Sequence, residues 1–165
     1  GMVIEGKAGF QIMGDWAKGA FTAAGKTPGV DYYCAATPSN NGYLYNVDSF
    51  IFYKSRDPDK QAGQKLLAKL MMGKNFQKVF NLYKGSIPAR LDVSMDEFDK
   101  CAKTSNADIK TAGAKGGLVP SFAHGMAQGN TMKAALQDII TEHFNSDMSS
   151  VDAANALADS VLANM

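Results

Sequence analysis

The chain has 165 residues, enough for one compact domain to bury about 70% of the surface of its unfolded chain. Its 17 basic and 16 acidic residues give a formal charge of +1, and the charges are scattered along the sequence. Such a chain presents no strong field to phosphate backbones or anionic lipids, so nucleic acid is not an expected partner. No window of about 18 consecutive apolar residues is present, so we expect no membrane-spanning segment.

The first third of the chain is expected to form strands and tight turns. Apolar and β-branched runs at residues 7–13, 30–36 and 43–53 predict three strands, and the second ends at the turn sequence "TPSNNG". After the first strand, Asp15 is expected to cap a short helix that runs to Phe21. Near-continuous apolar strands need neighbours inside a covered sheet, and the sequence supplies no other strong strands. The pattern is typical of part of a larger assembly.

Helical periodicity begins after Asp57. This residue and the following proline predict a cap and a first turn, and the helix that they open is expected to end at Gly73. A second apolar stripe is closed by Gly85, and Pro88 keeps the following "GSIPAR" segment extended.

The second half of the chain predicts three further helices. Ser94 and Glu97 form a capping box that is expected to open a helix containing Cys101. The glycine-rich stretch 105–129 is expected to be irregular, and two strongly periodic helices finish the chain. A few short strands with five or six helices place the chain in the α/β class, rich in helix.

The common sequence signatures of catalysis are absent. No GxSxG motif occurs, and "GAKGG" lacks both the preceding strand and the following GK[ST] of a phosphate-binding loop. His124 and His143 are too few and too far apart to form a metal site without carboxylates. We therefore expect no metal and no cofactor.

Two carboxylates are the remaining candidates for a catalytic or binding role. Asp15 and Asp48 lie among apolar and aromatic residues, and Asp15 precedes the only tryptophan, Trp16. Paired carboxylates that flank a sugar are typical of a glycosidase. The same pair beside an aromatic ring is also typical of a protein that only binds sugar. The alternatives are a helix cap for Asp15 and a backbone amide as the partner of Asp48, because an unpartnered buried polar group costs about 1–3 kcal/mol.

The order of several motifs resembles the C-terminal part of the periplasmic sugar-binding proteins of ABC transporters, with the glucose and mannose type most similar. The motifs are "GKAGFQIMGDWAKGAF", "PGVDYYCAATP", "NVDSFIFY", "NFQKVFNLYKGSIPARLDV", "FDKC" and "PSFAHGMA". The resemblance covers the chain after Gly6. It implies the two-lobe type II periplasmic binding protein fold, of which residues 1–165 are expected to be a single C-terminal fragment without the N-terminal lobe and the signal peptide.

The resemblance also implies roles for five residues. Trp16 is expected to be a stacking platform for the sugar, Asp48 and Arg90 to hold sugar hydroxyls, and His124 to add a polar contact, while Asp15 is a weaker match. Arg90 stands where some glucose binders are expected to have a lysine, and its alternative is a solvated residue in an extended segment. The alternative for His124 is a residue at a helix start whose side chain bonds to backbone.

The function that the resemblance implies is not enzymatic. A hexose such as glucose would be bound in the periplasm and presented to a membrane permease, with the protein peripheral to the membrane. Cysteine spacing alone leaves Cys34 and Cys101 open between a bridge and two free thiols, and a periplasmic location favours the disulfide. A lone fragment is expected to bind sugar weakly or not at all and to self-associate through open strand edges. The alternatives are a small glycoside-processing enzyme that uses Asp15 and Asp48, and an inactive truncated product.

Overall fold

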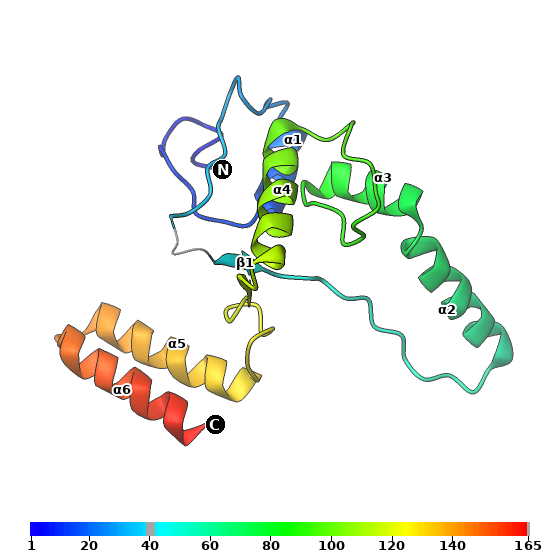
Figure 1. Ribbon diagram of the computed structural model, residues 1–165. Coiled ribbons are helices and arrows are strands. Elements are labelled where there is room, and N and C mark those ends of the chain that lie inside the picture. The colour runs from blue at the N-terminus through cyan, green and yellow to red at the C-terminus, as the bar shows by residue number, and fades with distance from the viewer. Residues whose placement is uncertain (39–41, 165) are drawn as a thin grey trace. The chain divides into compact units, whose positions relative to one another are not determined.

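The computed structural model describes residues 1–38 and 42–164, and it is rich in helix (Figure 1). Contacts divide the chain into a first unit, Gly1–Tyr43 with Val47–Gly117, and a second unit, Leu44–Asn46 with Leu118–Met165. In the described residues, no helix is both long and apolar enough to cross a membrane. The elements in chain order are η1 Asp15–Ala17, α1 Lys18–Ala23, β1 Tyr43–Tyr45, α2 Pro58–Met71, α3 Lys74–Lys84, α4 Lys100–Ala114, β2 Leu118–Pro120, α5 Asn130–Asn145 and α6 Ser150–Ala163.

Strands are fewer and shorter than the sequence predicts. β1 and β2 pair in a two-stranded sheet, in which the Tyr43 amide donates to the Gly117 carbonyl and the Ser121 amide to the Tyr45 carbonyl, both at 2.8 Å. The predicted strands at residues 7–13 and 30–36 are wrong, and the third is confirmed only over β1. A strand is stabilised by exchanging hydrogen bonds with a neighbour, so an apolar run without a neighbouring strand remains irregular.

α2 begins as predicted and ends at Met71, two residues before the predicted Gly73, and α3 ends before Gly85 as predicted. The Asp57 side chain accepts hydrogen bonds from the amides of Asp59 and Lys60 at 2.9 and 3.3 Å, with a proline in the first turn. α3 ends at Gly85, whose φ of 87° is the left-handed conformation that glycine adopts without a steric penalty. Because both signals are local, the sequence was sufficient to place these ends.

The predicted capping box at the start of α4 is wrong. Asp99 is the N-cap, and its carboxylate accepts from the Ala102 amide at 2.8 Å. Ser94 instead accepts from the Asp96 amide within a turn, and Glu97 pairs with Lys78 on α3 at 2.7 Å. α4 also extends through Ala114, so the first part of the stretch expected to be irregular is helical.

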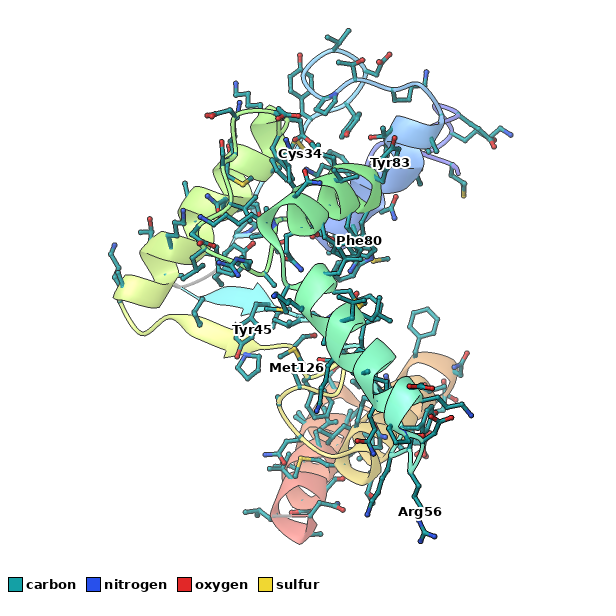
Figure 2. The ribbon with its side chains drawn as sticks, turned by 90° about the vertical axis from the view of Figure 1, so that its right-hand side faces the viewer. Cys34, Tyr45, Arg56, Phe80, Tyr83 and Met126 are labelled. Carbon is teal, nitrogen blue, oxygen red and sulfur yellow. A yellow bond between two sulfur atoms is a disulfide. The ribbon has the colours of Figure 1, made fainter. Side chains whose placement is uncertain are left out.

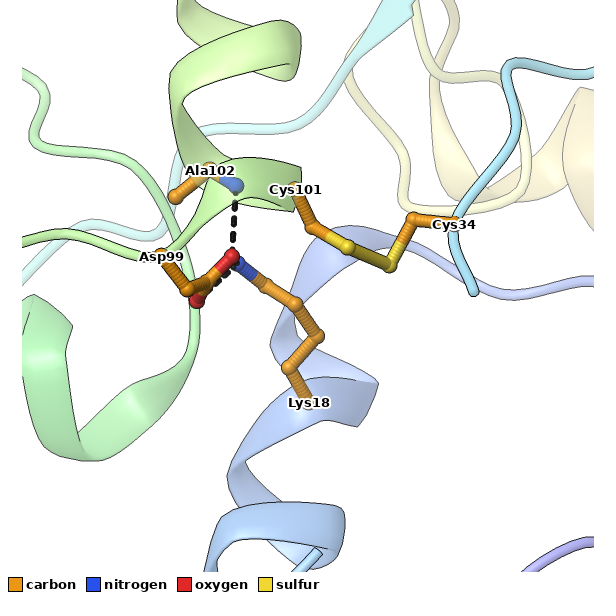
Figure 3. The surroundings of a disulfide bond; sticks show 5 residues. All are labelled: Lys18, Cys34, Asp99, Cys101 and Ala102. Atoms are coloured by element: carbon orange, nitrogen blue, oxygen red, sulfur yellow. Dashed lines mark hydrogen bonds and ion pairs between the residues drawn. A yellow bond between two sulfur atoms is a disulfide. The ribbon is translucent and has the colours of Figure 1, made fainter. Parts of the chain in front are cut away.

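Two cross-links hold distant segments at the start of α4 (Figure 3). The expected disulfide between Cys34 and Cys101 is confirmed, with 5.7 Å between the Cα atoms. Beside it, the buried Lys18 ammonium lies 2.9 and 3.1 Å from the two carboxylate oxygens of Asp99. Asp99 thus caps α4 and also binds α1, so one carboxylate joins two helices of the first unit.

The core of the first unit is small. It consists of Val93, Phe98 and Ala102, with Leu82, Ile87 and Met95 packed against them. The second unit contains an αα-hairpin in which α5 and α6 lie side by side (Figure 1). Ser149 caps α6 by accepting from the Asp152 amide at 3.1 Å, and Met132 and Ala153 are buried in the hairpin.

The helices α1 and α3 meet at two glycines. A Cβ on Gly85 would lie 2.5 Å from the Gly19 amide nitrogen, and one on Gly19 would lie 2.7 Å from the Lys84 carbonyl oxygen. No side chain fits between these backbones. The contact fixes the C-terminal end of α3, with Lys84, directly against α1.

Candidate functional site

Trp16 lies on the short helix η1, at the start of the η1–α1 segment. Its side chain is half-buried, and its ring covers the backbone of Gly14, where any Cβ would overlap the ring. Gly14 is therefore part of the support for the tryptophan. The ring position is set by η1 itself and by the absence of a side chain two residues earlier.

Asp15 does not cap the helix as predicted. Gly14 occupies the N-cap position without a side-chain hydrogen bond, and Asp15 is the first residue of η1. The Asp15 carboxylate instead accepts from the Ile87 amide at 2.9 Å, in the extended segment after α3. Burial raises the pKa of Asp15, against the opposing effects of this amide and of the Lys18 and Lys84 charges. Asp15 thus holds the segment after α3 against η1, beside Trp16.

The raised pKa predicts how an Asp15→Asn variant responds to pH. A carboxyl group whose folded pKa lies above the unfolded value contributes stability below the unfolded pKa, and this stability is lost as pH rises through the folded pKa. An amide oxygen still accepts from Ile87 but does not ionise. We therefore expect the stability of the variant relative to the wild type to be greater at pH 7 than at pH 3, as measured by urea unfolding at both values. An unchanged difference would contradict a raised pKa at Asp15.

Asp48 forms an ion pair with Lys84, the last residue of α3. Asp48 lies in the extended segment after β1 with its side chain 63% exposed, whereas the Lys84 side chain is 29% exposed. The Lys84 ammonium also lies 5.8 Å from the centre of the Phe80 ring and acts on the charge of Asp15. Lys84 therefore links the two carboxylates that the sequence singled out. The only sequence signal of Lys84 is its position at a helix end, directly before Gly85. This signal does not reveal its partner Asp48, which lies 36 residues away.

We call Asp15, Trp16, Asp48 and Lys84 the η1–α3 polar cluster. All four belong to the first unit, where Lys84 pairs with Asp48 and acts on the charge of Asp15, the residue before Trp16. The cluster offers an aromatic ring, hydrogen-bond acceptors on carboxylates and a donor on an ammonium. This is a suitable set for a neutral ligand with several hydroxyl groups. In residues 1–38 and 42–164, no group of three or more His, Cys, Asp or Glu side chains is arranged to hold a metal ion.

Arg90 is held by its neighbours. Its Nε and Nη2 atoms donate to the two carboxylate oxygens of Asp92, both at 2.8 Å, and Nη1 donates to the Met72 carbonyl at 3.0 Å. Lys74 also binds Asp92, at 3.0 Å. These hydrogen bonds hold the pKa of Asp92 well below its usual range and raise the pKa of Arg90. The guanidinium joins the segment after α3 to the end of α2.

His124 lies in the second unit, in the turn that follows β2. Its Nδ1 atom lies 2.6 Å from the hydroxyl oxygen of the buried Ser121. The alternative that places His124 at a helix start is wrong, because α5 begins only at Asn130. The ring is oriented by the serine three residues earlier, while its side chain remains exposed.

Comparison with known proteins gives relatives over almost the whole chain, although no protein-family model matches it. A "Probable sugar-binding periplasmic protein" of Brucella suis is 46% identical over 161 residues, which are 97% of this chain and 38% of the relative. The protein of the same name in Rhizobium meliloti is 42% identical over 97% of this chain and 39% of the relative. An "Uncharacterized ABC transporter extracellular-binding protein" of Pyrococcus horikoshii is 37% identical over 86% of this chain and 31% of the relative. The chain thus spans less than two fifths of the length of these relatives.

Proposed function

We propose that this chain is the C-terminal portion of a periplasmic sugar-binding protein that serves an ABC transporter. The observation that carries the proposal is the 46% identity, over 161 residues, to a relative named for sugar binding. The names of the relatives describe binding proteins, which supports binding and release rather than chemistry on the sugar. The implied partners are a monosaccharide and a membrane permease, and the protein itself would be peripheral to the membrane.

The η1–α3 polar cluster is the proposed contact surface for the sugar. The ring of Trp16 would cover the apolar C–H face of a pyranose. Asp48 accepts hydrogen bonds and Lys84 donates them, so adjacent hydroxyls of one sugar can bind to this ion pair. Asp15 supports the cluster through the Ile87 amide. We propose a hexose such as glucose as the ligand, and the polar contact expected from His124 stays a prediction.

Arg90 has a supporting role in this proposal. Its bidentate pair with Asp92 and its bond to the Met72 carbonyl occupy three of its nitrogen atoms inside the chain. For Arg90 we therefore propose the role of holding the segment after Lys84 against the end of α2, and not that of the main hydroxyl ligand.

The proposal predicts weak but specific sugar binding by this chain. In a ¹⁵N-labelled sample titrated with millimolar glucose, we expect shifts of the Trp16 indole resonance and of amides near Asp48 and Lys84. Asp48→Asn preserves the shape of the side chain and removes its charge. It should raise the dissociation constant for glucose, obtained from these shifts, at least tenfold. Asp59→Asn, in the first turn of α2, is the matched control and should bind as the wild type does.

Two outcomes would contradict the assignment of the η1–α3 polar cluster as a sugar-binding surface of this chain. One is the absence of any shift with glucose, mannose, galactose, xylose or arabinose. The other is release of a chromogenic leaving group from an aryl glycoside, abolished by Asp48→Asn, which would identify a glycoside-processing enzyme instead.

A further inference from the structure

Lys18 is a charged residue that is buried inside the first unit, two positions after Trp16. Its side chain is 7% exposed, whereas the other lysines of the described ion pairs are between 29% and 74% exposed. Removing an ammonium group from water costs free energy unless a counter-charge binds it. The burial of Lys18 therefore depends on its partner.

The partner is Asp99 at the start of α4. The two carboxylate oxygens of Asp99 lie 2.9 and 3.1 Å from the Lys18 ammonium (Figure 3). One of these oxygens also accepts from the Ala102 amide at 2.8 Å, and the disulfide joins Cys34 to Cys101 in the same turn (Figure 2). Asp99 is thus held by the helix that it caps, and the held carboxylate fixes the position of the ammonium.

Lys18 also contacts the segments that carry the proposed sugar site. η1 has three residues, runs directly into Lys18 and packs against both α1 and α4. A Cβ on Gly85 would lie 3.1 Å from the Lys18 Cβ, so the end of α3 packs directly on this residue. The charge of Lys18 also acts on the Asp15 carboxylate. Lys18 therefore lies where η1, the end of α3 and the start of α4 meet.

We propose that Lys18 and Asp99 are positioning residues of the sugar site, which hold η1 so that the Trp16 ring stays in place. The inference rests on the proposed function, because it takes the η1–α3 polar cluster as the sugar site. A helix of three residues does not fix its own orientation, since a single turn forms few hydrogen bonds for the residues that it orders. Binding sites depend on such support of their contact residues by a second layer of side chains. The pair thus supplies an orientation that η1 alone lacks.

Two single variants remove the pair in different ways. Lys18→Met keeps the length of the side chain and removes its charge. Asp99→Ser removes the carboxylate but keeps a side-chain oxygen that can cap α4. In both variants we expect a shifted emission maximum of Trp16 without sugar, and a dissociation constant for glucose at least tenfold higher. Asp57→Ser, the same substitution at the N-cap of α2, is the matched control and should leave both values unchanged.

The double variant Lys18→Met/Asp99→Ser distinguishes positioning from stability. Asp99→Ser alone leaves the buried ammonium without its partner, which lowers the urea midpoint of unfolding. The double variant contains neither charge, so its midpoint should lie above that of Asp99→Ser. Its Trp16 emission and its affinity for glucose should remain altered, because no contact replaces the link from η1 to α4.

Two results would overturn the proposal. One is a wild-type emission maximum, or a wild-type affinity for glucose, in Lys18→Met and Asp99→Ser. The other is a double variant whose affinity for glucose recovers together with its urea midpoint, which would show that the pair contributes stability alone. If the wild type binds no hexose, the proposed function fails, and the emission maxima without sugar still decide whether the pair positions Trp16.

Discussion

Gly85→Ala is expected to lower the free energy of unfolding of the first unit by about 3 kcal/mol. Part of the cost is the left-handed backbone, since a residue with a Cβ loses about 1–2 kcal/mol there. The rest is overpacking, because the new Cβ would lie 2.5 Å from the Gly19 amide nitrogen. Urea unfolding followed by the fluorescence of Trp16, the only tryptophan, measures the effect in the unit concerned.

Substitutions at two further glycines distinguish the cost of the left-handed backbone from the cost of overpacking. Gly116 also has a positive φ, of 69°, but a Cβ added there would meet no atom within 4 Å, so Gly116→Ala should cost only about 1 kcal/mol. Gly63 lies in α2 with open space around it, and Gly63→Ala should raise the stability by up to about 1 kcal/mol. Equal costs at Gly85 and Gly116 would contradict the close contact between α1 and α3.

Loss of the disulfide is the second large effect. Cys34 and Cys101 are 67 residues apart, and closing a loop of that length stabilises the folded state by about 4 kcal/mol in the chain-entropy account. We expect the double variant Cys34→Ser/Cys101→Ser to unfold at much lower urea than the oxidised wild type. Dithiothreitol should lower the midpoint of the wild type and leave the double variant unchanged. A wild type that unfolds at the same urea with and without reductant would contradict the role of the bridge.

Helix ends could be predicted where the deciding atoms are close in sequence. Asp57 bonds to amides two and three residues away, and Gly85 ends α3 through its own backbone conformation. The predicted start of α4 is wrong because two possible N-cap acceptors compete there. Ser94 bonds locally, whereas Asp99 also gains the buried Lys18, which lies 81 residues away and leaves no local pattern.

Strands could not be predicted in the same way, because strand formation depends on a partner. The apolar run at residues 49–53 has the composition of a strand, yet it remains extended and exposed. Only β1 has a described neighbour in β2 and forms a ladder. An apolar pattern of this kind predicts the capacity to pair, and the neighbouring strand decides whether pairing occurs.

The proposed site could also be predicted only in part, because some of its contacts join residues that are far apart in sequence. The sequence singled out Asp15, Trp16 and Asp48 but missed Lys84, because the ion pair with Asp48 joins two segments 36 residues apart. For Arg90, the sequence does contain a local signal of its partner. Asp92 follows two residues later and accepts both hydrogen bonds of the guanidinium fork.

The most direct test of the proposed sugar site is the fluorescence of Trp16 during titration with glucose. We expect a saturable change in emission for the wild type and binding at least tenfold weaker for Lys84→Met, because the donor beside Asp48 is lost. Lys78 lies on the same helix as Lys84, and Lys78→Met, which removes only the ion pair with Glu97, should bind as the wild type does. An emission that no hexose changes, or an equal response in Lys84→Met, would contradict the assignment of the η1–α3 polar cluster as the sugar site.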